Sequence, residues 1–206
     1  MAEPNPINDA VSYGYEGNVA LLCINNPPVN AMGVAVREGI MHAVEVINDQ
    51  AKAKVIVVYC AGRTFIAGAD IREFAKPPMG PSYGEALSAL EDSALPTVSI
   101  IHGTALGGGF ETALATHARV GISGAKFGLP EVLLGIIPGA GGTQRLPRVT
   151  SIAYALDIAL SGRHVSVEEG ARDGAIDRVV DSGDPREIAI ATGREVIEGN
   201  LNPRRP

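Results

Sequence analysis

Three consecutive glycines, Gly107, Gly108 and Gly109, stand just before a single acid, Glu111. An apolar, strand-like run precedes the glycines, and a helix-like run follows them. Glycine lets the backbone approach a ligand closely, and the first N–H groups of a helix have no partner within that helix. The stretch is therefore suited to presenting N–H groups to a negative oxygen. That oxygen could belong to a phosphate, or to a carbonyl group that gains charge during a reaction.

Two phosphate-binding patterns do not fit these glycines. No Gly-Lys-Ser/Thr follows them, and Thr112 stands where the third glycine of a G-x-G-x-x-G fingerprint would be. An acid at Glu111 would also repel a phosphate. A developing enolate, by contrast, needs N–H donors with a proton-transfer group nearby. A second glycine-flanked loop, 65–70, can supply another N–H group, and a lone acid, Glu131, stands in a third glycine-rich segment, 128–148.

The elements that must position these loops alternate between strand and helix. Continuous apolar runs predict four strands, at 19–24, 54–61, 97–103 and 119–124. Helices are predicted at 33–51, 85–93 and 110–118, and near Thr143; the region 151–199 is mostly helical, with a short strand at 177–181. This alternation predicts one α/β domain with parallel or mixed strands and crossover helices.

The composition excludes several classes of protein. Apolar residues make up 46 % of the 206 residues, which is too much for a disordered chain. With 4 % aromatic residues, no Trp and a net charge of -6, a nucleic-acid-binding surface is not expected. Cys23 and Cys60 lie in strand-like runs and are predicted to be buried thiols of a reducing compartment. We expect a soluble, cytoplasmic chain without signal peptide or membrane span, which leaves open an organelle address on sequence outside these residues.

Three segments together resemble the crotonase superfamily, the enoyl-CoA hydratases and isomerases. They are "AGADI" at 67–71, "ALGGGFE" at 105–111 and "LPEVLLGIIPGAGGTQRLPR" at 129–148, and the resemblance extends from about Val19 to Val180. "GLPE" and the tail "LNPRRP" look most like the hydratase/isomerase part of multifunctional fatty-acid β-oxidation enzymes. The resemblance implies a spiral of repeated ββα units and hydration of trans-2-enoyl-CoA to 3-hydroxyacyl-CoA, with Δ3-Δ2 isomerisation as a side activity.

The resemblance also implies roles for individual residues. The thioester oxygen would lie between the backbone N–H groups of Ala69 and Gly108. Glu111 would activate the water that attacks C3, and Glu131 would deliver a proton to C2. No cofactor besides the acyl-CoA substrate is implied, and no His, Cys or Asp cluster has the spacing of metal ligands.

Substrate contacts follow from the same resemblance. The glycine loops would contact the CoA moiety through Ala67, Gly68, Asp70, Ile71, Gly107 and Gly109. Arg63 and Arg72 are either ligands of the CoA phosphates or solvated surface charges. The acyl slot has four candidates, Leu133, Leu134, Ile136 and Ile137, and a role in the core competes for each.

Several alternatives remain open at this point. The chain could catalyse another crotonase-type isomerisation or hydrolysis, or could be a non-catalytic acyl-CoA-binding module. Asp70 is expected to fix its loop by side-chain-to-backbone bonds, the glycines at 139–142 to shape a turn, and His102 and His117 to be core or surface residues.

The predicted organisation is one hydratase domain over 1–199 and the start of a linker or a truncated tail over 200–206. Stand-alone hydratases continue with further helices, so the C-terminal helical region is expected to be truncated and an apolar face to be exposed. A homo-oligomer, or a dehydrogenase domain downstream in a longer protein, would each fit this organisation.

Overall fold

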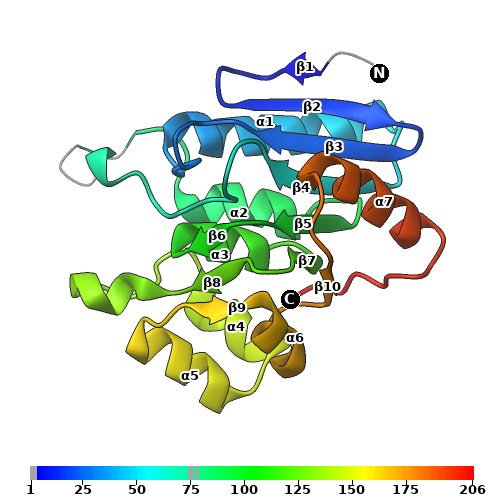
Figure 1. Cartoon of the computed structure of the whole chain (residues 1–206). Helices are drawn as coiled ribbons and strands as arrows, with labels where there is room; N and C mark the ends of the chain where they lie inside the picture. The colour runs from blue at the N-terminus through cyan, green and yellow to red at the C-terminus, as the bar shows by residue number, and fades with distance from the viewer. Residues whose placement is uncertain (1–3, 74–76, 78) are drawn as a thin grey trace.

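The computed structural model of the chain describes residues 4–73, 77 and 79–206 (Figure 1). A seven-stranded sheet has the strand order β1-β2-β3-β4-β5-β7-β10, and a three-stranded sheet has the order β6-β8-β9. The strands of the large sheet are β1 (Asn5–Pro6), β2 (Val11–Glu16), β3 (Val19–Ile24), β4 (Val55–Cys60), β5 (Thr97–Ile101), β7 (Ala118–Ile122) and β10 (Arg178–Val180). Those of the small sheet are β6 (Thr104–Leu106), β8 (Lys126–Gly128) and β9 (Val165–Ser166).

The chain forms a spiral in which each turn adds one parallel strand to the large sheet. All pairings from β3 through β4, β5 and β7 to β10 are parallel. After its strand, each of two turns adds a short strand of the small sheet and then a helix: β5, β6 and α3 (Gly108–Leu114), then β7, β8 and α4 (Gly142–Val149). Figure 1 shows these turns stacked along the sheet. The predicted spiral of ββα units is thereby confirmed.

The earlier turns carry longer helices. α1 (Val34–Gln50) follows β3, and α2 (Tyr83–Glu91) follows β4. In these turns an isolated bridge joins Met32, just before α1, to Ala69, just before η1. The bridge thus joins the connection between β3 and α1 to the connection between β4 and α2, at the level of the small sheet.

The remaining helices lie toward the C-terminus. They are α5 (Ile152–Ser161), α6 (Val167–Asp173) and α7 (Pro185–Ile197), and short 3-10 helices occur as η1 (Ile71–Glu73) and η2 (Pro130–Leu134). None of the helices in the described part of the chain combines the length and apolar character needed to cross a membrane.

Apolar side chains cover both faces of the large sheet. In β4, Ile56 and Val58 pack into the core beside α1, whereas Val55 and Val57 face the opposite cluster, which contains Ala189 of α7. Alternate strand residues point to opposite faces, so a continuous apolar run is what a strand buried on both sides requires. The prediction of a two-sided strand at this place is confirmed.

The structure differs from the sequence predictions in the N-terminal hairpin and in the helix after the glycines. β2 was not predicted, although it pairs with β3 as an antiparallel hairpin across Gly17, whose φ is +60°. The helix after the glycines begins at Gly108 and ends at Leu114, so it does not extend over 110–118. After Leu114 the backbone tightens, since the Thr116 N–H donates to the Ala113 carbonyl oxygen, and β7 begins at Ala118.

Both cysteines are free thiols, as predicted, but their burial differs. Cys60 is buried, whereas Cys23 is half-buried, because Cys23 lies toward the side of the sheet where α7 leaves part of β3 accessible. Burial raises the pKa of both thiols.

The C-terminal residues lie against the domain. Leu201 packs into the cluster beside α7, and the Arg204 N–H donates to the His117 carbonyl oxygen. The division into 1–199 and 200–206 stays a prediction. The expected exposed apolar face is present: large apolar side chains at η2, the residues after it and α5 reach solvent, among them Leu133, Leu134, Ile137, Ile152, Leu156 and Leu160.

Candidate active site

Gly107 and Gly109 are required by their surroundings for different reasons. Gly107 has a φ of +51°, and a Cβ atom there would lie 2.8 Å from Oε1 of Glu131. A Cβ atom on Gly109 would lie 1.9 Å from the Ile66 carbonyl oxygen, which is far inside van der Waals contact. Gly107 therefore leaves room for the Glu131 carboxyl, and Gly109 lets α3 touch the segment that leads to the second glycine loop.

Gly108, the middle glycine, has room for a Cβ atom. A Cβ atom there would make ordinary contacts, 3.5 Å from a ring carbon of Tyr83 and 3.9 Å from the amide nitrogen of Ala69. Gly108 is also the first residue of α3, so its N–H has no acceptor within the helix. The amides of Gly108 and Ala69 thus lie close together, although 39 sequence positions separate 69 from 108.

One cavity of about 230 Å³ collects the four predicted catalytic residues. Ala69 and Gly108 line it together with Glu111 and Glu131. Its other lining residues are Tyr83, Ile136, Ile137, Gly139 and Ala140. Two backbone amides and two carboxyl groups from three turns of the spiral therefore share one apolar pocket.

Glu111 is fixed by backbone donors. Its side chain is buried, and Oε1 accepts the N–H groups of Ala140 and Gly142, each at 2.8 Å. Burial raises the pKa of Glu111, while these two hydrogen bonds and the nearby Arg145 oppose that rise. Two N–H donors thus hold one oxygen of Glu111 in a fixed orientation, and the nearby charge of Arg145 favours its carboxylate form.

Glu131 is held less firmly. It lies on η2, which begins at Pro130, and its buried Oε2 has no hydrogen-bond partner among the described residues. Burial raises the pKa of Glu131 to about 7, and the negative charge of Glu111 adds to the rise. Near neutral pH, Glu131 is therefore a carboxyl group that can carry a proton.

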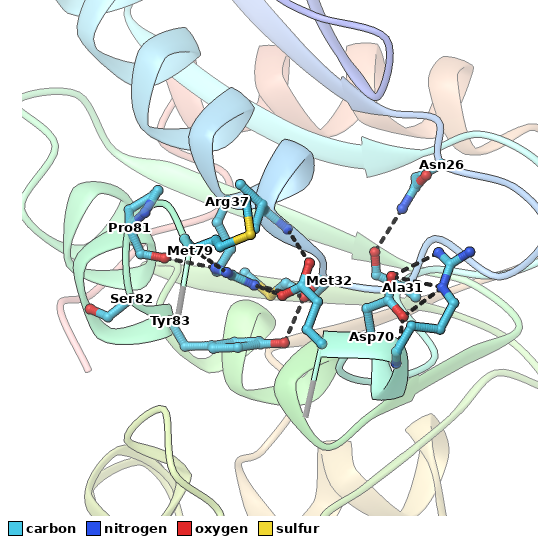
Figure 2. Close-up of polar contacts among 12 residues, drawn as sticks. Asn26, Ala31, Met32, Arg37, Asp70, Met79, Pro81, Ser82 and Tyr83 are labelled. Atoms are coloured by element: carbon cyan, nitrogen blue, oxygen red, sulfur yellow. Dashed lines mark hydrogen bonds and ion pairs between the residues drawn. The ribbon is translucent and has the colours of Figure 1, made fainter. Parts of the chain in front are cut away.

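The loop that carries Ala69 is fixed by Met32. The Met32 N–H donates to the Gly68 carbonyl oxygen at 2.9 Å, and the Met32 carbonyl oxygen accepts the Tyr83 hydroxyl at 2.7 Å. Figure 2 shows Tyr83 reaching Met32 beneath the side chain of Arg37. Tyr83, which lines the pocket opposite Gly108, is therefore connected to the same segment that positions Ala69.

Arg37 joins the elements on this side of the pocket. Its buried guanidinium donates to the carbonyl oxygens of Met32 and Pro81 at 3.2 and 2.8 Å and forms an ion pair with Glu73 at 2.9 Å. It also lies 4.5 Å from the centre of the Tyr83 ring, a cation–π contact (Figure 2). The sequence analysis did not single out Arg37 or Tyr83. The one available signal was that Arg37 lies next to the apolar stripe of a predicted helix.

The predicted CoA contacts lie outside the pocket lining. Ile71 is exposed at the start of η1, and the Ala67 N–H donates to the Val29 carbonyl oxygen. Asp70 accepts the backbone N–H of Arg72 and forms an ion pair with its side chain (Figure 2), which agrees with the expected loop-fixing role. The CoA-binding assignments of Ala67, Gly68, Asp70, Ile71, Gly107, Gly109, Arg63 and Arg72 stay predictions.

The four apolar candidates for the acyl slot divide into two pairs. Ile136 and Ile137 line the pocket, whereas Leu133 and Leu134 do not. All four are exposed, so the alternative of a core role is wrong. The glycine segment 139–142 does more than shape a turn, because it supplies the two N–H donors of Glu111.

Neither histidine near the glycine motif enters the pocket. His117 accepts the Thr97 N–H at 2.9 Å and contacts the Glu91 carbonyl oxygen, and His102 contacts the Gly62 carbonyl oxygen. Burial lowers the pKa of both rings. No group of three or more His, Cys, Asp or Glu side chains that could hold a metal ion occurs in the described part of the chain.

Comparisons with known proteins identify the family of the chain. The profile of the family described as enoyl-CoA hydratase/isomerase matches residues 14–202. A peroxisomal bifunctional enzyme of Danio rerio is 44% identical over 188 residues, which cover 91% of this chain and 26% of that protein. A probable enoyl-CoA hydratase of Bacillus subtilis is 38% identical over 175 residues, covering 82% of this chain and 68% of the relative.

Solved structures give the same result. An enoyl-CoA hydratase from Bacillus anthracis superposes with a TM-score of 0.84 at 32% identity, covering 92% of this chain and 77% of that structure. The chain spans only about a quarter of the length of the bifunctional relative, 26%. The resemblance to part of a multifunctional enzyme is thereby confirmed, and the chain belongs to the enoyl-CoA hydratase/isomerase family.

Proposed function

We propose that this chain hydrates trans-2-enoyl-CoA thioesters to 3-hydroxyacyl-CoA. The observation that carries the proposal is the single pocket lined by Ala69, Gly108, Glu111 and Glu131. Hydration needs donors for a carbonyl oxygen that becomes negative, a base for water and an acid for the adjacent carbon. A binding module without turnover would not need two carboxyl groups in an apolar pocket, where burial disfavours their charged forms.

The thioester oxygen would bind between the Ala69 and Gly108 N–H groups. Such a donor typically contributes about 2.7–4 kcal/mol to stabilising a transition state, because its dipole is already oriented when the negative charge develops. Gly108 lacks a side chain at the point where the thioester would pass. The adjacent Tyr83 ring would form one wall of the passage.

The two glutamates would divide the proton transfers. Glu111, held as a carboxylate by two N–H donors, would take a proton from water as the water oxygen attacks C3. Glu131, with its pKa raised to about 7, would give its proton to C2. The net reaction adds H and OH across the double bond and exchanges one proton between the carboxyl groups. It is redox-neutral, so the proposal needs no cofactor besides the CoA ester.

Isomerisation is a second proposed activity for the same pocket. A carboxyl group whose pKa is near neutral can both accept and donate a proton, and one oxygen of Glu131 has no partner among the described residues. Glu131 could therefore take a proton from C2 and return it at C4, with the enolate held by the same two amides.

The relatives suggest a setting for this activity. Several are named peroxisomal, and one from Arabidopsis thaliana is named a fatty acid β-oxidation multifunctional protein. We therefore propose β-oxidation as the pathway, a peroxisomal location, and a longer protein in which a dehydrogenase segment consumes the hydroxyacyl product. A homo-oligomer is a further part of this proposal, supported by the exposed apolar side chains of η2 and α5.

Turnover of the chain itself tests the proposed reaction. Loss of the conjugated-thioester absorbance of crotonyl-CoA measures hydration, and a decenoyl-CoA substrate reports acyl-chain preference. A 3-enoyl-CoA substrate, whose absorbance would rise, measures isomerisation. Binding of these esters without any turnover would favour the binding-module alternative, and release of free CoA would favour a hydrolase.

A further inference from the structure

A second buried arginine lies behind the loop that holds Glu111. Arg145 of α4 donates from Nη1 to the Ala140 carbonyl oxygen at 2.8 Å. Its Nε and Nη2 both donate to the same oxygen of Glu91 on α2, at 2.9 and 2.5 Å. Arg145 does not line the pocket, and its side chain is 10% exposed. This guanidinium therefore connects α2 to the loop before α4 without touching the site.

Ala140 is the point at which this contact meets the catalytic group. The carbonyl oxygen of Ala140 is held by Arg145, and the N–H of the same residue donates to Glu111. Ala140 is thus the single residue that links the Arg145 guanidinium to the Glu111 carboxylate. A shift of Ala140 caused by loss of Arg145 would act directly on the N–H donor of Glu111.

The loop needs such an anchor because its own backbone is permissive. Gly139, Gly141 and Gly142 surround Ala140, and glycine restricts the backbone least of all residues. Gly141 has a φ of +101°, and a Cβ atom there would lie 2.3 Å from Nη1 of Arg145. The loop therefore has room for the guanidinium, and the Arg145 side chain fixes the geometry of the loop.

We propose that Arg145 is the positioning residue of Glu111, acting through Ala140 and held in turn by Glu91. The proposal rests on the function assigned above, in which Glu111 activates the water. Arg145 holds Ala140, which supplies one of the two N–H donors that orient the carboxylate, so that a water bound to Glu111 would stay in line with C3. A positioning error of about 1 Å at a reacting group can lower a rate by up to about 100-fold.

Arg145 also acts on Glu111 by its charge. The charged groups that face Glu111 are Arg145 from α4 and Glu131 from η2. The positive charge of Arg145 lowers the pKa of Glu111, and the two N–H bonds lower it as well. Loss of Arg145 weakens both influences, so Glu111 would become protonated at a higher pH.

The test compares R145M with R145K and with R148M, a variant of an exposed arginine on the same helix. We expect R145M to lower kcat for crotonyl-CoA by about 10- to 100-fold with KM changed less than about threefold, and to move the acid limb of the pH profile upward. R145K should retain more activity, because its ammonium keeps the charge and one bond. R148M should match the unaltered chain.

Two further measurements separate positioning from folding and from the proposed function. The double variant E91L/R145M removes both members of the buried ion pair, so it avoids an unpaired buried charge and should show the same loss of kcat. Carbon NMR titration of the Glu111 carboxyl should show a raised pKa in R145M, whether or not the chain hydrates crotonyl-CoA. Failure of the unaltered chain to hydrate any enoyl-CoA would overturn the function and leave this titration as the test.

Unchanged kcat, pH profile and Glu111 titration in a folded R145M variant would overturn the proposal. A kcat that falls only in proportion to the folded fraction, while the acid limb and the Glu111 titration stay in place, would overturn it as well.

Discussion

The two acids of the pocket differ in what holds them. Glu111 belongs to α3, whose described side chains are all buried, and two N–H donors fix one of its oxygens. Glu131 is the second residue of η2, the side chains that follow it up to Ile137 are exposed, and one of its oxygens has no partner in the described part of the chain. The two N–H donors favour the ionised form of Glu111 against the effect of its burial, whereas a pKa of about 7 suits Glu131 to carry a proton. The same residue type therefore serves as base on one side and acid on the other, because the surroundings differ.

The largest expected effect comes from removing either acid. E111Q and E131Q should each lower kcat for enoyl-CoA hydration by about 10²- to 10⁴-fold, the usual contribution of a positioned acid or base. E111Q should also remove the acid limb of the pH profile, and E131Q the alkaline limb, which the raised pKa of Glu131 places near 7. Stopped-flow and steady-state rates across pH measure both. Wild-type rates in both variants would disprove the assignment, and identical pH profiles would remove the division of labour.

Adjacent glycines provide the next contrast. G109A should lose the folded state or unfold at a much lower temperature, because its Cβ atom would lie 1.9 Å from the Ile66 carbonyl oxygen. Overpacking of this kind costs about 1–3 kcal/mol or more. G108A, whose Cβ atom finds 3.5 Å of space, should fold normally and lose activity, because the methyl group would occupy the substrate passage. Thermal unfolding and turnover of the two variants measure this pair, and an active G108A would argue against a thioester passing Gly108.

Stability should depend on pH through Glu131. Burial raises its folded-state pKa to about 7, above the unfolded value of about 4.5, so the folded chain binds more protons between these values. Its contribution to stability is therefore full below about pH 4.5 and is lost as pH rises through about 7. E131Q removes this loss. The difference in unfolding free energy between E131Q and wild type should therefore change in favour of E131Q by about 1–2 kcal/mol as the pH rises from 5 to 8, after allowance for solvent near the group.

Denaturant unfolding at both pH values measures this difference. E187Q changes an exposed glutamate on α7 and serves as a control. A difference between E131Q and wild type that does not change with pH would mean that Glu131 titrates normally in the folded chain.

The smallest expected effect is that of Y83F. The variant keeps the ring against Gly108 and loses one hydrogen bond to Met32, whose carbonyl oxygen still accepts from Arg37. We expect a loss of about 0.5–1.5 kcal/mol in unfolding free energy and a change in kcat of less than about fivefold. A loss of kcat as large as that of E131Q would instead give the hydroxyl group of Tyr83 a part in the reaction.

The sequence predicts the residues that carry the chemistry better than it predicts the residues that hold them in place. The runs at 19–24 and 54–61 specify strands because a parallel sheet buries both faces, and Gly107–Gly109 indicate a close approach of the backbone. Glu111 and Glu131 were assigned through their motifs, and both line the pocket.

The sequence analysis missed the residues that hold the site in place, such as Arg37, Tyr83 and Arg145, because their partners are distant in sequence. Arg37 bonds Glu73 and Pro81, and Arg145 bonds Glu91, so only the folded spiral brings these groups together. The hairpin of β2 with β3 was missed for a related reason: Val11–Glu16 contains two tyrosines and a glycine and lacks a continuous apolar run.

A structure with an unreactive acyl-CoA thioester bound tests the central claim most directly. We predict that the thioester oxygen lies about 2.7–3.1 Å from the amide nitrogens of both Ala69 and Gly108, with one water molecule in contact with the carboxyl groups of Glu111 and Glu131. A thioester oxygen that meets neither amide, or carboxyl groups too far apart to share a water molecule, would contradict the account.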